Sequence, residues 1–220
     1  MVDERRIQVK NECATGSGPV VYVVAREQRV HDNWALLYAQ EQALERGVSL
    51  CVLFALGPMF CSGTARHNAW MMASLKEVET NLEKHNVPFF IEIGEWKDVI
   101  PAFVNKHGIG EVVFDFNPLQ PVRGWRDAVT EQVDCKVVEV DARNIVPVWE
   151  ASPKADYAAY TLRPKINRQL REFLTQIPKL EKQTVKWSSA VPKIDWEAVE
   201  SYRSFAVDAP VPNRFKGGEK

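Results

Sequence analysis

Five short runs of β-branched and aromatic residues alternate with segments of helical pattern, and this alternation constrains the fold more than any other feature of the chain. Each run is nearly continuous in apolar residues, which is typical of a strand buried on both faces. A half-buried strand would instead alternate with polar residues. The five runs are Val20–Val24, Val48–Leu56, Val87–Ile93, Glu111–Phe116 and Lys136–Val140.

The segments between these runs have apolar residues at steps of three and four, which places those residues on one face of a helix. Strand and helix alternate four times at lengths that suit right-handed crossovers, so the pattern predicts a parallel sheet with helices on both faces. We expect a doubly wound, five-stranded α/β domain of the Rossmann-like kind over residues 18–150, with strand order 3-2-1-4-5.

The two ends of the chain lack this pattern. Residues 1–17 are charged and polar, and with Gly16 and Gly18 at the end of the stretch they predict a flexible leader. Near the other end, apolar spacing predicts a helix over Arg163–Leu174, and four prolines interrupt the residues beyond it. Residues 151–220 are therefore interpreted as a helix and a linker rather than a second core.

Composition excludes several classes of protein. The chain has 28 Lys and Arg against 29 Asp and Glu, so a protein that coats nucleic acid is excluded and any DNA contact would be local.

The longest apolar run of the chain, Leu50–Leu56, is far shorter than the roughly 20 residues of a membrane-spanning helix. The N-terminus has no apolar core of a signal peptide, which predicts a cytoplasmic protein without a membrane partner. Four cysteines without a C-x-x-C pair predict reduced thiols and no metal site.

Ligands of open parallel sheets bind at the carboxyl ends of the strands, so the loops at that edge hold the candidate site. The loop after the first run, residues 25–33, contains no glycine, which argues against a dinucleotide fingerprint or a P-loop. Arg26 and Arg29 in this loop could bind a carboxylate, a phosphate or a polar ring. Asp32, at the end of the loop, is interpreted as the N-cap of the first helix.

Asp115 and Asn117 follow the fourth run and bring a carboxylate and an amide to the same edge. In the predicted order the first and fourth strands are neighbours, so these two residues and the two arginines predict one pocket for a planar ligand with polar edges. Two simpler interpretations stay open: ordinary turn and capping chemistry before a proline, or a pair between Arg26 and Asp115 that only joins the loops. No Ser/His/Asp or Cys/His arrangement is present, so we expect no catalytic residue in this chain.

Several motifs resemble those of a known family. Residues 26–36, REQRVHDNWAL, are similar to the R-D-Q-R-x-x-D-N-W-A-L signature of class II DNA photolyases. Residues 115–119 resemble D-F-S-P-L, and residues 140–149 resemble V-D-A-H-N-I-V-P-x-W. The matches continue in order through TLRPKI at 161–166. Over about residues 20–175 the chain therefore resembles the N-terminal α/β domain of class II members of the photolyase/cryptochrome family. Three positions depart from the pattern: Glu27 replaces an Asp, Arg143 a His, and Tyr160 a residue that is commonly Arg or His.

This resemblance implies part of a light-driven DNA repair enzyme, a carbon–carbon lyase that splits cyclobutane pyrimidine dimers. In the family an all-helical domain follows, binds FAD and receives the damaged DNA, and residues 214–220 resemble its start. We therefore expect no cofactor, no retained FAD and no lyase activity in this chain alone. The family's N-terminal domain can hold a deazaflavin or folate antenna.

The same resemblance names the expected partners. These are damaged DNA, reached through the helical domain, and that FAD-binding domain itself. Residues Asn144–Trp149 and Arg163–Leu174 are expected to dock there, and to support self-association when they are uncovered. Two other functions stay open: a stand-alone nucleotide- or flavin-binding α/β module, and a structural domain that pairs with a separate FAD-binding chain.

Overall fold

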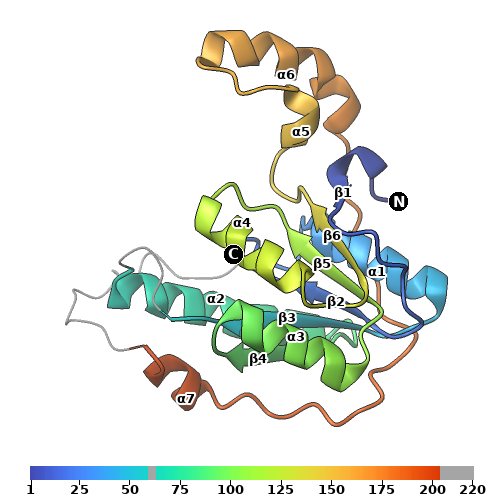
Figure 1. The fold of residues 1–220 in the computed structure, drawn as a ribbon, viewed down its shortest axis with the longest axis vertical. Coiled ribbons are helices and arrows are strands. Elements are labelled where there is room, and N and C mark those ends of the chain that lie inside the picture. The colour runs from blue at the N-terminus through green and yellow to red at the C-terminus, as the bar shows by residue number, and fades with distance from the viewer. Residues whose placement is uncertain (59–62, 204–220) are drawn as a thin grey trace.

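A six-stranded sheet between helices forms the body of the protein in the computed structural model (Figure 1), which describes residues 1–58 and 63–203. Cys61 and the motif at 214–220 lie outside the described residues. The strand order is β1-β6-β5-β2-β3-β4. Among the described helices, none is both long and apolar enough to cross a bilayer.

Five of the strands are parallel and follow the predicted order. The central strand β2 (Val20–Val23) pairs with β3 (Leu50–Leu56) on one side and with β5 (Glu111–Asp115) on the other. Next to β3 lies β4 (Phe89–Ile93), and next to β5 lies β6 (Lys136–Val140). The doubly wound α/β fold and the order of its parallel strands are therefore confirmed.

The sixth strand, β1 (Ile7–Val9), was not expected. It pairs antiparallel with the outer edge of β6 and follows a 3-10 turn over Glu4–Arg6. The sheet is thus mixed and six-stranded rather than parallel and five-stranded, and residues that we expected in a flexible leader form an edge strand. Three residues between charged neighbours carry no readable strand pattern, because their pairing depends on an edge that the rest of the chain builds.

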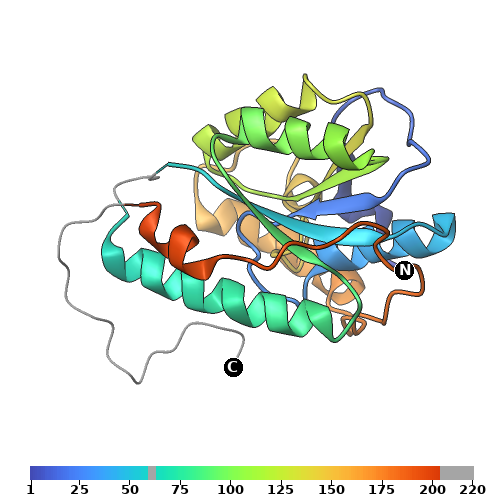
Figure 2. The ribbon, with the colours of Figure 1, turned by 90° about the horizontal axis from the view of Figure 1, so that it is seen from below.

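The helices cover both faces of the sheet (Figure 2). On one face, α1 (Trp34–Arg46) and α2 (Ala65–Glu83) share a core cluster with the sheet. On the other face, α3 (Trp96–His107) and α4 (Gln120–Thr130) share a second cluster. Each strand contributes alternate residues to the two clusters, which explains why the apolar runs are continuous.

A short helical arm projects from the body beyond β6 (Figure 1). It consists of α5 (Val148–Ala151) and α6 (Ala159–Phe173), which share a small cluster of their own. Helix α6 begins four residues before the predicted start, and Pro164 lies inside it. A proline disfavours helix in the residues before it, yet the packing of Leu162 in the arm cluster selects the earlier start.

The segment after the arm packs against the body, although its prolines predict a loose linker. Leu180 is buried in the first cluster, and the side chain of Gln40 both accepts from and donates to the backbone of Glu181. The segment ends in α7 (Trp196–Ser201), which lies beside α2 (Figure 2) and buries Val199. Proline here sets an extended path along the body.

The glycines at the amino edge of the sheet make a close backbone contact. Gly16 N donates to Gly110 O at 2.9 Å, and a Cβ on Gly18 would lie 1.7 Å from Gly108 O. Arg46 secures the same segment, since its Nη2 donates to the carbonyls of Gly16 and Gly18 at 2.5 and 2.7 Å. These glycines therefore belong to the packed body.

Replacing Gly18 with alanine should lower the free energy of unfolding by about 1–3 kcal/mol, because the new methyl group can be fitted only by moving backbone. Urea unfolding followed by circular dichroism measures this change. Gly124→Ala is the matched control: a Cβ at Gly124, in α4, meets nothing within 4 Å, so this variant should be neutral or slightly more stable. Equal stability of the two variants would contradict the close contact.

Candidate functional site

The loop that follows β2 is built around the carboxylate of Asp115, at the end of β5. Its Oδ2 accepts hydrogen bonds from the backbone N–H groups of Ala25, Arg26 and Glu27 at 3.3, 2.9 and 2.7 Å, and from the hydroxyl of Tyr22 at 3.2 Å. The residue is 3% exposed. Asp115 therefore joins the ends of two neighbouring strands and is not itself presented to a ligand.

Burial dominates the electrostatics of Asp115. Its pKa is raised from 3.8 to about 6, mainly because burial disfavours the charged form. The negative charge of Glu27 raises the pKa further, whereas the hydrogen bonds from the three backbone N–H groups lower it. Its second oxygen, Oδ1, is buried without a hydrogen-bond partner. The same surroundings raise the pKa of Tyr22, so this phenol stays neutral.

Arg29 is also engaged in building the loop. Its guanidinium pairs with the buried carboxylate of Glu27 and donates to the carbonyls of Asp32 and Ala142 at 3.1 and 3.3 Å. The Nε of Arg143 reaches the same Glu27 carboxylate at 2.7 Å. Arg29 therefore closes the loop over the end of β6, and its ligand-facing role has no support in these contacts.

The first helix begins with a different cap from the one predicted. Asn33, not Asp32, is the N-cap of α1, and its Oδ1 accepts from the N–H groups of Ala35 and Leu36 at 3.1 Å each. Asp32 takes a φ of 51°, a left-handed conformation that Asp tolerates. Both residues are typical N-caps, so only the path of the loop decides between them.

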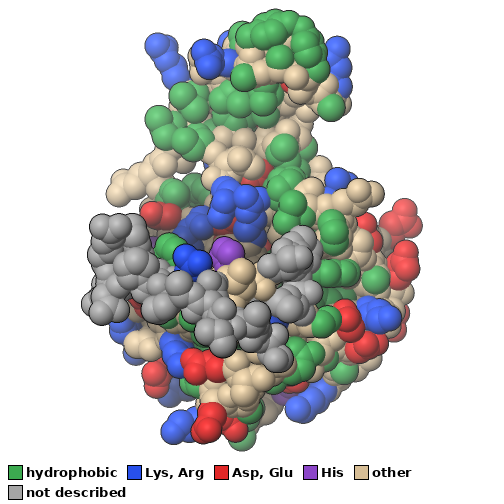
Figure 3. All heavy atoms as spheres, turned by 90° about the vertical axis from the view of Figure 1, so that its left-hand side faces the viewer, with side chains coloured by type: hydrophobic (Ala, Val, Ile, Leu, Met, Phe, Trp, Pro, Cys, Tyr) green, Lys and Arg blue, Asp and Glu red, His purple; other side chains and the backbone are tan. Residues whose placement is uncertain are grey.

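Arg26 and Asn117 lie together at a cavity of about 500 Å³ above the carboxyl ends of β2, β3 and β5. Figure 3 looks onto this edge, where Lys and Arg side chains gather around a His beside residues drawn in grey. The Arg26 guanidinium makes no hydrogen bond or ion pair with the described residues. Asn117 accepts from Leu119 N at 3.0 Å, as in the turn chemistry expected before a proline.

The structure adds walls to this cavity that the sequence did not single out. Asn68, on α2, lines it, and its Oδ1 is buried without a hydrogen-bond partner. Trp96, on α3, forms an aromatic wall and is fixed by a bond from its Nε1 to Ala55 O at 3.1 Å. Near the end of the described chain, Arg203 donates to Gly57 O at the rim.

The cavity can therefore orient a flat, partly polar molecule. Within the described residues, the Arg26 guanidinium is a donor without a partner and Asn68 Oδ1 an acceptor without one, while Trp96 and Trp125 supply apolar ring surface. Its volume lies within the range of about 300–1,000 Å³ that is typical of ligand sites. Asn68 lies in the first turns of α2, outside the two loops that the sequence singled out, and no motif around it indicated a ligand.

Asp115→Asn gives a test of the buried carboxyl group. Asparagine can keep the acceptor at Oδ2 and place its amide at the unpartnered Oδ1. Because the folded pKa of Asp115 is raised, its contribution to stability is full below pH 3.8 and is lost as the pH rises to about 6. Relative to the wild type, the variant should gain about 2 kcal/mol between pH 4 and pH 7, measured by urea unfolding. A difference that is independent of pH would contradict it.

Comparisons with known proteins agree with this architecture. The family model described as DNA photolyase matches residues 20–182. The chain is 45% identical over 185 residues to a deoxyribodipyrimidine photo-lyase of Potorous tridactylus, covering 82% of this chain and 34% of that protein. It is 37% identical to the enzyme of the same name from Arabidopsis thaliana, covering 73% of this chain and 33% of that one.

A solved structure shows the same fold. The archaeal photolyase from Sulfolobus tokodaii, described with two FAD molecules and a novel light-harvesting cofactor, superposes with a TM-score of 0.66 at 14% identity. That match covers 91% of this chain and 44% of the archaeal one. The chain thus spans about a third of the length of the curated relatives that it matches. On its sequence and its architecture together, the chain belongs to the DNA photolyase family.

Proposed function

We propose that this chain is the N-terminal α/β part of a class II photolyase that repairs cyclobutane pyrimidine dimers, and that its cavity holds an antenna chromophore. The motif at residues 26–36 supports the class II assignment. The flavin and the reacting DNA would bind in the part of the relatives that this chain does not match. Here the role of the α/β part is to hold the antenna and to support the catalytic half.

The single observation that supports the antenna role is the cavity with two polar groups that have no partner among the described residues. A buried acceptor without a donor, such as Asn68 Oδ1, costs free energy that a bound N–H group would recover. The free guanidinium of Arg26 suits a carboxylate, a phosphate or a ring carbonyl on the same ligand. Heterocyclic chromophores with amide edges, such as deazaflavins, flavins and folates, carry both kinds of group.

The chain's own residues bind and orient the antenna in this proposal. Arg26 and Asn68 would hold its polar edge, and the ring of Trp96 would supply an apolar contact surface. The chromophore supplies light absorption and energy transfer when it is bound. Because Asp115 holds the backbone of Arg26, a residue that does not touch the ligand sets the position of one that does.

The arm supports pairing with a further domain. Large apolar side chains are exposed at and beside it, with Ile145 48%, Val148 42% and Leu174 63% exposed. A stand-alone flavin-binding module has no need of such a surface, whereas a domain that docks to a helical partner does. This favours the photolyase assignment over the stand-alone alternative.

Chromophore titration tests the cavity. We expect 8-hydroxy-5-deazaflavin, methenyltetrahydrofolate or FAD to quench or enhance fluorescence on binding, with at least one of them saturable. Arg26→Ala should weaken that ligand about tenfold or more, since it removes a charged hydrogen bond, and Asn68→Leu should weaken it by a similar factor. Arg163→Ala, on the arm, is the control with unchanged affinity.

If Arg26 only supports the loop, a different result follows. Arg26→Ala would then bind every chromophore as tightly as the wild type and would unfold at lower urea. Absence of saturable binding by all three chromophores would refute the antenna role.

Repair activity gives a separate test. The purified chain should split no thymine dimers in blue light and should retain no stoichiometric FAD after gel filtration, because the proposed catalytic flavin site lies outside the matched third of its relatives and the open cavity would hold added chromophore only weakly. The deoxyribodipyrimidine photo-lyase of Potorous tridactylus, assayed in parallel, is the positive control. Flavin absorbance that coelutes with the chain, together with dimer splitting, would overturn this part of the proposal.

A further inference from the structure

The outward face of helix α6 differs in charge from the rest of the protein. Arg163, Arg168 and Arg171 are all exposed and, at 100° per residue, fall within about 140° of arc on one side of the helix. Tyr160 and Asn167 lie within the same arc and are exposed as well. No acidic residue lies in it, although the whole chain carries a net charge of -1.

The acidic residues near this face are already paired with other cations. Asp156 binds Lys165 at 2.8 Å, and Glu172 binds Arg5 at 2.9 Å. The three arginines make no ion pair with a described carboxylate. Among the described residues their side chains make one hydrogen-bond contact, from Arg168 Nε to Pro164 O at 3.5 Å. Their positive charge is therefore uncompensated within the described residues.

The opposite face of α6 explains why this side stays outward. Leu162, Ile166, Leu170 and Phe173 pack in the arm cluster, so the helix cannot rotate without exposing them. The arginine face is thus fixed in direction, and the arm carries it away from the body (Figure 1).

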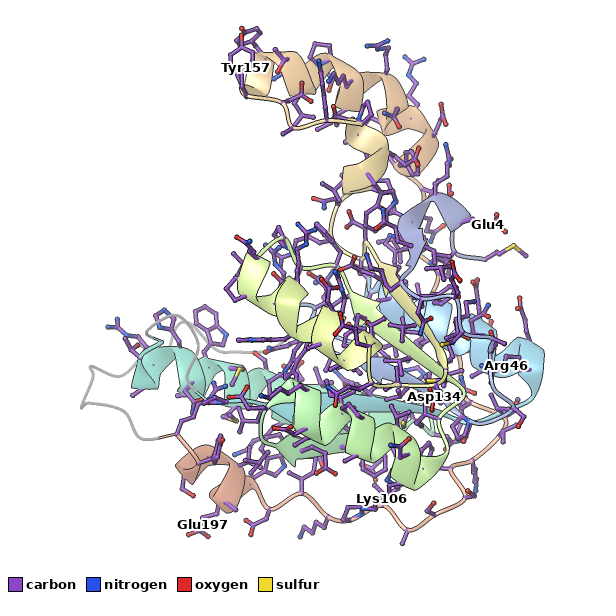
Figure 4. All side chains as sticks on the ribbon, in the orientation of Figure 1. Glu4, Arg46, Lys106, Asp134, Tyr157 and Glu197 are labelled. Carbon is purple, nitrogen blue, oxygen red and sulfur yellow. The ribbon has the colours of Figure 1, made fainter. Side chains whose placement is uncertain are left out.

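Two tyrosines stand at the end of this face. Tyr157, labelled at the tip of the arm in Figure 4, is 82% exposed, and Tyr160 is 66% exposed. Their rings meet edge to face, with centroids 5.8 Å apart. Exposed aromatic rings beside arginines are the combination that single-stranded nucleic acid binds, through base stacking and phosphate contacts.

From this arrangement we infer that the outward face of α6, made of Arg163, Arg168 and Arg171 with Tyr157 and Tyr160 at its tip, binds the phosphate backbone of DNA without sequence preference. Arg163 and Arg171 are separated by about 12 Å along the helix, a span of three to four phosphates of one strand. Arginine also pairs with phosphate in bidentate geometry. The choice of DNA over other polyanions rests on the proposed function, whereas the surface itself does not.

A salt titration tests the arginines. Binding of a fluorescein-labelled 20-base-pair duplex is followed by anisotropy from 20 to 150 mM KCl. With three phosphate contacts, log K should fall with log salt at a slope of about 2.7, and each single Arg→Ala change should reduce that slope by about 0.9. The triple variant R163A/R168A/R171A should bind at least tenfold more weakly at 50 mM KCl.

The matched control removes the same charge elsewhere. Lys97, Lys106 and Lys182 are exposed away from the arm, and K97A/K106A/K182A should leave the slope and the affinity near those of the wild type. Equal losses in the two triple variants would overturn the inference, because they would show only a general effect of net charge. Equal losses toward polyglutamate and DNA would overturn it too, by indicating an acidic protein as the partner.

The tyrosines have their own test. Y157A/Y160A should bind a single-stranded 20-mer at least about fivefold more weakly, and Y157F/Y160F should bind it like the wild type, because phenylalanine keeps the stacking ring. Unchanged binding by Y157A/Y160A would show that the two tyrosines do not contribute to the DNA-binding surface.

None of these measurements requires a chromophore. Loss of DNA binding with intact chromophore binding, or the reverse, therefore separates this inference from the proposed antenna site.

Discussion

One buried carboxylate accepts hydrogen bonds from three consecutive backbone N–H groups, and this interaction organises the carboxyl edge of the sheet, where the candidate site lies. Asp115 ends β5 and holds the residues that leave β2, so the two strands at the reversal of strand order are joined by a single side chain. The free energy of desolvating the carboxylate opposes this arrangement, as the raised pKa shows. The hydrogen bonds from the three backbone N–H groups offset that cost, and they hold the backbone of Arg26 in place, which orients its side chain.

A second buried carboxylate extends the same network. Glu27 is 0% exposed and is neutralised by Arg29 and Arg143. Glu27 and Arg143 are two of the three positions at which the sequence departs from the family pattern, and the structure brings them into direct contact. Glu is longer than Asp and Arg is longer than His, and the two departures from the motif together form one ion pair across the loop.

The N-terminal segment holds the arm to the body. The buried guanidinium of Arg6 donates to the carbonyls of Asp141, Asn144 and Ile145 and lies over the ring of Trp34. Trp149 Nε1 in turn donates to Arg5 O. The segment up to the edge strand β1 therefore positions the arm: it brings two arginines to the base of the arm, which sets the direction of both its exposed apolar side chains and the arginine face.

The sequence by itself determined the fold class and the order of the parallel strands, because nearly continuous apolar runs of five to nine residues are typical of parallel strands covered by helices on both faces. It also identified the residues of the β2 and β5 loops. Only the tertiary structure decided their roles, since Asp115 and Arg29 form hydrogen bonds with residues that are distant in sequence, while the Arg26 guanidinium has no such partner among the described residues. Asn68, the strand β1 and the path of the chain after the arm could not be predicted for the same reason: each depends on surfaces that exist only once the sheet and its helices have packed.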